Sequence, residues 1–155
     1  MVTLDPAFAN RYADNVQKST SKLDDMLKTI DSQAENLKDR PVVLMNEALI
    51  YGAQDYGLTV ADWIDRESGT AFYDQQLTNC LERLSESGAR LILIERQAPQ
   101  SFVDALEQAG YAVARIDIFS THRQGEGFDD YIDAQLKNAE AICDAFKKAE
   151  EAGKP

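Results

Sequence analysis

The chain has 155 residues, enough for one domain around a single hydrophobic core, and 28% of them are charged. Its 27 acidic and 16 basic side chains give a net charge of −11, which opposes binding to nucleic acid or anionic lipid. No apolar run approaches the roughly 18 residues that a membrane span requires, and residues 1–6 show no signal peptide. We therefore expect a single domain over 1–155, with no nucleic-acid partner and no membrane span.

The first segment predicts one long helix over 5–38. Its apolar residues recur at steps of three, four and seven: Phe8, Tyr12, Val16, Leu23, Met26 or Leu27, Ile30 and Leu37. Asp5 and Pro6 form a typical helix start, because Asp can cap the first turn and Pro lacks an amide hydrogen that would stay unpaired there. A helix of this length would span about 50 Å, against a small-domain width of about 30 Å. Part of it is expected to contact something outside this chain.

Strands and helices are expected to alternate over 41–149. Apolar runs predict strands at 42–45, 58–64, 91–94 and 111–119, and helical spacing predicts helices at 47–56, 72–87, 99–109 and 128–148. Residues 150–155 are expected to be frayed. Strands joined by single helices pair in parallel, with right-handed crossovers. The expected fold is α/β, a four-stranded parallel sheet covered by helices and preceded by a long N-terminal backbone helix.

Two cysteines, Cys80 and Cys143, lack the spacing of a redox motif or a zinc finger. Each falls on the apolar side of an expected helix. Both are therefore expected to be buried free thiols.

Polar residues follow all four expected strands: Asn46-Glu47, Asp65-Arg66-Glu67, Glu95-Arg96-Gln97 and Ser120-Thr121-His122. In a parallel sheet the carboxyl ends of the strands share one edge, where ligands commonly bind. Strand ends are solvated in any α/β protein, so each group taken alone carries little weight. Their coincidence predicts a binding rim at this edge.

The only histidine, His122, limits the chemistry of this rim. A zinc site usually takes at least three protein ligands, and His122 with Glu47 and Glu95 makes an incomplete set. A tight metal site would need ligands from elsewhere. No GxSxG motif surrounds Ser120, and Gly125-Glu126-Gly127 lacks the third glycine of a dinucleotide loop, so an enzyme is the least favoured class.

The order of these segments resembles the carboxyl-terminal lobe of the zinc- and manganese-binding solute-binding proteins of bacterial ABC transporters. The similarity covers almost the whole chain. It rests on LDPAFANRYADNVQKSTSKLDDML, RPVVLMNEALIYGAQDYGL, LILIERQAP, RIDIFSTH and DDYIDAQLKNAEAICDAF. These stretches are similar to the family's backbone helix, its ligand-bearing strand end with Tyr-Gly-Leu, its strand followed by Glu, and its last strand and helix.

This resemblance implies a binding protein outside the cytoplasm, in the periplasm or as a cell-surface lipoprotein, that delivers metal to an ABC permease. The family binds its metal between two lobes, with ligands from each. The chain would then be one lobe, and the amino-terminal lobe, which the family's export signal precedes, would be absent from it. The backbone helix that extends past its own domain agrees with that expectation.

The family's ligand positions carry altered residues in this sequence. Asn46 falls where a ligand His or Glu usually stands, and Thr121 falls where a ligand Asp stands. The next residues, Glu47 and His122, would restore a carboxylate and an imidazole after a shift of one position, with Glu95 and Gln97 supporting them. Two alternatives stay open. One is a rearranged zinc or manganese site. The other is a lobe that has lost its metal and either acts as a protein-interaction module, for example by forming a homodimer, or binds another small solute.

Overall fold

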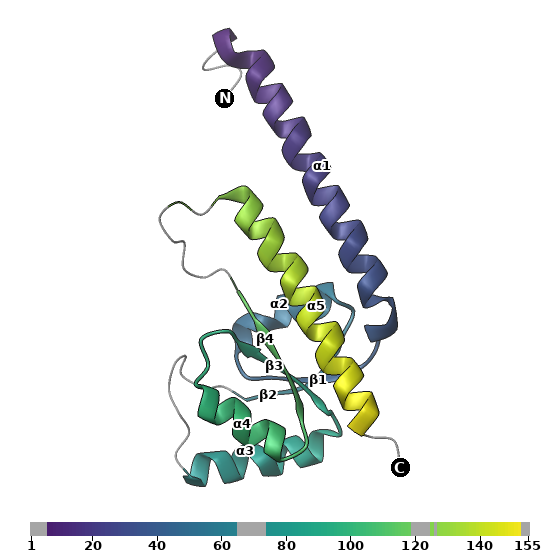
Figure 1. The fold of residues 1–155 in the computed structure, drawn as a ribbon, viewed down its shortest axis with the longest axis vertical. Helices are drawn as coiled ribbons and strands as arrows, with labels where there is room; N and C mark the ends of the chain where they lie inside the picture. Colours follow the sequence, from purple (N-terminus) through teal and green to yellow (C-terminus); the bar gives the residue numbers. More distant parts are fainter. Residues whose placement is uncertain (1–5, 65–73, 119–124, 126, 153–155) are drawn as a thin grey trace.

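The structure is a computed structural model, and it describes residues 6–64, 74–118, 125 and 127–152 (Figure 1). Its α-helices are α1 (Ala9–Ala34), α2 (Ile50–Asp55), α3 (Asp74–Ser87), α4 (Gln100–Gln108) and α5 (Phe128–Ala152). Three short 3-10 turns are η1 (Pro6–Phe8), η2 (Glu35–Leu37) and η3 (Glu47–Leu49). The strands are β1 (Pro41–Leu44), β2 (Thr59–Trp63), β3 (Leu91–Glu95) and β4 (Ala112–Ile116). None of the described helices is long and apolar enough to cross a membrane.

The four strands form one sheet in the order β2-β1-β3-β4. Every neighbouring pair is parallel, with Leu44 level with Leu93, and Glu95 level with Ile116. The prediction of a four-stranded parallel sheet is confirmed. All carboxyl ends therefore lie at the same edge, as the proposed rim requires.

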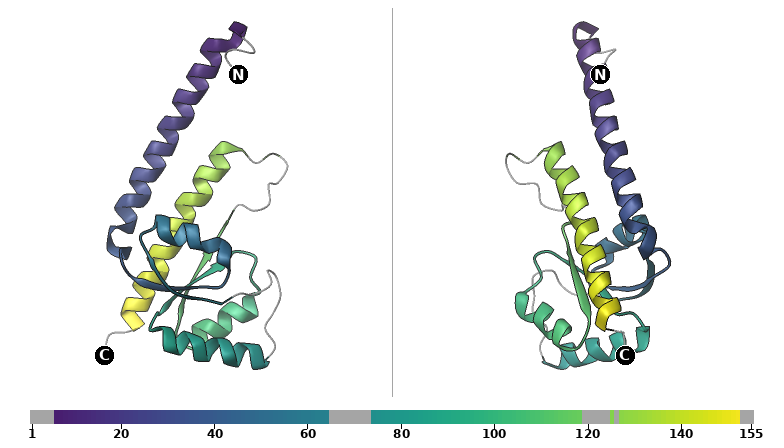
Figure 2. Two further views of the ribbon diagram at one scale, coloured as in Figure 1. Left: turned by 180° about the vertical axis from the view of Figure 1, so that it is seen from behind. Right: turned by 45° about the vertical axis from the view of Figure 1, so that its right-hand side comes forward.

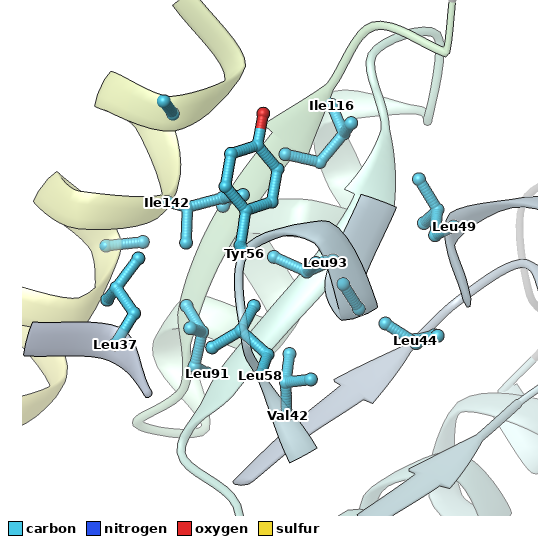
Figure 3. Close-up of a cluster of buried hydrophobic side chains, with 14 of the residues drawn as sticks. Leu37, Val42, Leu44, Leu49, Tyr56, Leu58, Leu91, Leu93, Ile116 and Ile142 are labelled. Atoms are coloured by element: carbon cyan, nitrogen blue, oxygen red, sulfur yellow. The ribbon is translucent and has the colours of Figure 1, made fainter. Parts of the chain in front are cut away.

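Helices cover both faces of this sheet (Figures 1 and 2). One face packs against α1, α2 and α5, and Leu93, Tyr56 and Ile142 lie together there (Figure 3). The other face packs against α3 and α4 through residues such as Leu84 and Leu106. All five residues of β3 are buried, because both faces of this central strand are covered.

The long helix α1 runs beside α5, and its first half extends past the rest of the protein (Figure 1). With its flanking 3-10 turns, the helical segment runs from Pro6 to Leu37, close to the predicted 5–38. Asp5, the predicted cap, lies outside the described residues. Lys22 Nζ contacts Asp129 Oδ1 at 2.5 Å near the start of α5, and Arg40 contacts Glu150 at 3.5 Å near its end.

Two expectations about helix boundaries are corrected. The helix predicted over 47–56 begins as the 3-10 turn η3 and becomes α-helical only at Ile50. The fraying predicted from Glu150 is wrong for Glu150 to Ala152, which continue α5. Arg40 explains this, because its guanidinium lies 5.0 Å from the centre of the Phe146 ring and also contacts Glu150.

The cysteines are free thiols, as predicted, although only Cys80 is fully buried. Cys143 is half-buried, and its thiol donates a hydrogen bond to the Gln33 carbonyl at 3.4 Å.

Candidate functional site

The order of the strands places a crevice at the carboxyl ends of β1 and β3. From β1 the chain crosses to β2 on one side, and from β3 it crosses to β4 on the other. The helices that follow these strands lie on opposite faces, α2 with the α1–α5 layer and α4 with α3. Ligands of open α/β sheets commonly bind where the order reverses in this way. Asn46, Glu47 and Glu95 stand at this point.

Asn46 and Glu47 occupy different roles at the end of β1. The side-chain Oδ1 of Asn46 accepts a hydrogen bond from the Ala48 amide at 2.9 Å, so Asn46 caps the turn η3. Glu47 is the first residue of that turn, and its side chain is exposed at the rim. The cap therefore fixes the backbone from which the Glu47 carboxylate projects.

Glu95 and Gln97 differ sharply in exposure. Glu95 is the last residue of β3 and is fully buried, whereas Gln97 lies exposed in the turn that follows. A buried carboxylate at a strand end is unusual, because burial of an ionised group is costly unless other groups compensate for it. Glu95 thus belongs to the interior of the rim, and Gln97 belongs to its surface.

Three residues that the sequence did not single out organise the neighbouring end of β4. Asn138 of α5 accepts a hydrogen bond from the Asp117 amide and donates one to the Asp117 carbonyl, both at 2.9 Å. The Asp117 carboxylate pairs with Arg96 at 2.8 Å. Arg115 donates to the carbonyls of Arg96 and Ala98 at 2.8 and 2.9 Å, which fixes the turn after β3. In the sequence, only the charged residues within 115–117 and the position of Asn138 on the predicted last helix could have indicated these residues.

Two hollows lie beside these residues, and both are lined by Asp117 and Asn138. The first, of about 240 Å³, is polar, and its lining residues include Arg96, Lys137, Asp130 and Asp133. The second, of about 200 Å³, lies between α2 and α5 over the ends of β3 and β4, with Leu93 and Ile116 among its lining residues. Asp117 and Asn138 thus lie between a space lined mainly by charged side chains and one lined by both polar and apolar side chains.

Tyr56 lines the second hollow, and its hydroxyl donates a hydrogen bond to the Gln135 carbonyl at 3.3 Å. Burial raises the pKa of Tyr56 well above its usual range, and nearby Asp55 acts in the same direction. Tyr56 therefore stays neutral and serves as a hydrogen-bond donor.

The described part of the rim does not complete a metal site. No group of three or more His, Cys, Asp or Glu side chains that could hold a metal occurs within 6–64, 74–118 and 127–152. The predicted ligands Thr121 and His122 lie outside the described residues, as do Asp65 to Glu67. Of the predicted ligands, the structure places Asn46 and Glu47 at the end of β1, next to the strand that ends in Glu95.

The turn η1 and the projecting half of α1 that follows it carry apolar side chains on one face. Phe8 and Val16 are 48% and 66% exposed, and Tyr12 is half-buried. They continue the helical face on which Met26 and Ile30 are buried. Tyr12, Val16 and Leu23 line an open hollow of about 860 Å³. This face continues the surface that packs against α5 further along the helix.

The comparisons with known proteins agree with this architecture. A family model described as the periplasmic component A of a zinc-uptake complex matches residues 1–145. The comparison with curated protein sequences gave no match. This match identifies the chain as a member of a solute-binding protein family: it belongs to the family of the periplasmic component A of zinc-uptake complexes. This is a family of metal-binding proteins that serve transport.

Solved structures share the fold at low identity. A mutant of FpvC from Pseudomonas aeruginosa is 19% identical with a TM-score of 0.80, over 94% of this chain and 54% of that one. The periplasmic zinc-binding protein TroA from Treponema pallidum is 16% identical with a TM-score of 0.62, over 93% of this chain and 55% of that one. ZnuA is 19% identical with a TM-score of 0.62, over 94% and 52%.

FpvC is also known in complex with Ni²⁺ and with Mn²⁺. The chain described here spans about half the length of the structures it matches.

Proposed function

We propose that this chain is one lobe of a zinc- or manganese-type solute-binding protein, and that it holds a divalent cation at the strand-end rim. The observation that carries the proposal is Glu47, an exposed carboxylate on a capped turn at the point where the strand order reverses. His122 would supply an imidazole from the segment after β4. Glu95 and Gln97 would support these ligands from the end of β3.

The ligand chemistry suits a metal that the lobe holds weakly. Carboxylate oxygen and imidazole nitrogen are common ligands of zinc, and manganese favours oxygen. Two protein ligands leave most coordination positions to water or to another protein surface. The lobe by itself should therefore bind metal less tightly than a complete two-lobed protein.

The projecting half of α1 fits an amino-terminal lobe as the partner that completes the cleft. Its apolar face is exposed at Phe8 and Val16, and apolar surface of this kind usually marks an interaction site. In that assembly the protein would act outside the cytoplasm and pass its cation to an ABC permease. In the isolated chain the same face would favour a homodimer.

A second candidate function follows from Asn46. At the family's ligand position stands an amide whose oxygen already accepts a hydrogen bond from Ala48. Such a lobe could have lost the usual metal and act as a protein-interaction module, or bind another small solute. This alternative predicts that neither zinc nor manganese binds.

Calorimetric titration of the whole chain with zinc and with manganese, at pH 7.5 and pH 5.5, tests the proposal. Because protonated imidazole cannot bind metal and its reference pKa is about 6.5, binding should weaken strongly at the lower pH. Glu47→Gln and His122→Ala should each abolish binding. Glu107→Gln, at an exposed site near the end of α4, is the matched control and should leave it unchanged.

The outcomes separate the two candidates. Binding that survives both Glu47→Gln and His122→Ala would place the cation elsewhere. No binding of either metal at pH 7.5 would favour the interaction module or a different solute.

A further inference from the structure

Asn138 is one of two polar residues that are buried within the described part of the chain, the other being Glu95. It lies on α5 and is 5% exposed. A buried amide is costly unless its donor and its acceptor are both used. Its Oδ1 and Nδ2 satisfy this condition on one residue, the main chain of Asp117, at 2.9 Å each. With the side-chain amide turned over, Nδ2 would face the Asp117 amide and Oδ1 would face the Asp117 carbonyl, so neither hydrogen bond could form.

Asp117 is the first residue beyond β4, and β4 is an edge strand with β3 as its only neighbour in the described sheet. The last sheet contacts of this edge are the pairing of Glu95 with Ile116 and the Arg96 amide donating to the Ile116 carbonyl at 2.8 Å. Beyond Ile116 the side chain of Asn138 takes the place that a neighbouring strand would occupy. It therefore sets the direction in which the chain leaves the sheet.

The end of β3 is joined to the same point. The Asp117 carboxylate contacts Arg96 at 2.8 Å, and Arg96 directly follows the buried Glu95. Three elements, α5, the end of β4 and the end of β3, thus meet at Asp117. The two hollows on either side of Asp117 and Asn138 leave room for this strand end to move if the contacts are lost.

We propose that Asn138 is a positioning residue for the metal-binding rim: through the main chain of Asp117 it holds the end of β4 in register with Glu95 at the end of β3. This inference rests on the proposed function, because the cation is the reason why that register matters. Asn138 itself touches no ligand. Its role is one step further from the cation than that of the hydrogen-bond partners that orient metal ligands directly. Loss of such partners typically lowers metal affinity about 10- to 100-fold, so an effect at the lower end of this range is expected here.

Two variants of the full chain test the inference. Asn138→Leu removes both hydrogen bonds at similar volume. Asn138→Asp keeps the acceptor for the Asp117 amide and loses only the hydrogen bond to the Asp117 carbonyl. Glu140→Gln, two residues further along α5 at an exposed site, is the control. Amide hydrogen exchange and calorimetric titration with zinc and manganese at pH 7.5 are measured for each protein.

We expect faster exchange at Asp117 and Ile118 in Asn138→Leu, with the amides of Val43 and Leu44 in β1 unchanged. We expect Asn138→Asp to remain folded and to bind metal up to about 10-fold more weakly than the wild type. The control should match the wild type in both measurements.

The inference is overturned if Asp117 exchanges at its wild-type rate in Asn138→Leu, or if protection falls equally in β1, which would make Asn138 merely a stability residue. It is also overturned if folded Asn138→Asp binds metal as the wild type does. If the wild-type chain binds neither metal, the proposed function fails, and with it the metal part of this inference. The exchange data then decide by themselves whether Asn138 fixes the strand end.

Discussion

Asn46 can either cap the turn η3 or bind the cation, and two substitutions separate these roles. Asn46→Ala removes the side-chain oxygen that accepts from the Ala48 amide at 2.9 Å. Asn46→Ser replaces the amide with a hydroxyl, which is also a good helix cap but a poor ligand for zinc. The two variants differ mainly in whether the cap survives.

The cap sets the expected magnitude. Loss of a capping side chain costs about 1 kcal/mol of stability. For a chain of this length, that loss lowers the melting temperature by roughly 2–4 °C. Because Glu47 follows the cap directly, looser placement of its carboxylate should lower metal affinity by at most about fivefold, the equivalent of the same 1 kcal/mol. Asn46→Ser should stay close to the wild type in both respects.

The assay is thermal unfolding by circular dichroism, combined with calorimetric titration with zinc at pH 7.5. The expected pattern is a small loss of stability and of affinity in Asn46→Ala, and little change in Asn46→Ser. A loss of affinity well beyond tenfold in both variants, with Asn46→Ser as stable as the wild type, would show that Asn46 binds the cation. It would refute the one-residue shift to Glu47.

Thermal unfolding of the chain should show one cooperative transition, and a broad melt would contradict this. Ile142→Ala should destabilise the protein by about 2–5 kcal/mol, because Ile142 is fully buried in the α5 layer. A loss below about 1 kcal/mol in urea unfolding would contradict this packing. Sedimentation should reveal a dimer that Val16→Glu dissociates. Ser21→Glu is the control and should not dissociate it, because Ser21 lies about 140° further round α1, at about 100° per residue. A strict monomer at high concentration would argue against association through the apolar face of α1. Burial raises the pKa of the Cys143 thiol, with Lys147 acting against the shift, so the thiolate fraction is depressed in the folded state and grows only as pH rises. Peptide-level mass spectrometry should therefore show slower alkylation of Cys143 at pH 8 than in the urea-unfolded chain, and equal rates would contradict the shift.

The sequence alone determined the order of the elements and the edge of the sheet at which the strands end. The alternation of apolar strands with amphipathic helices predicted a parallel sheet, because single helices between strands leave few other connections. Glu47 and Glu95, which stand at the ends of two neighbouring strands, then had to lie at one edge. The helical spacing from Phe8 to Leu37 predicted a helix longer than the domain, as the structure shows (Figure 1).

Only the tertiary structure decided what these side chains contact. Asn46 and Glu47 are neighbours in sequence, yet one caps a turn and the other projects from it. Asn138 lies 21 residues from Asp117, and no local pattern connects a helix amide to the end of an edge strand. Apolar periodicity is a local property that each segment carries by itself. The hydrogen-bond partners and the burial of Asn138 depend on which segments meet, and the packing of α5 against the end of the sheet determined both.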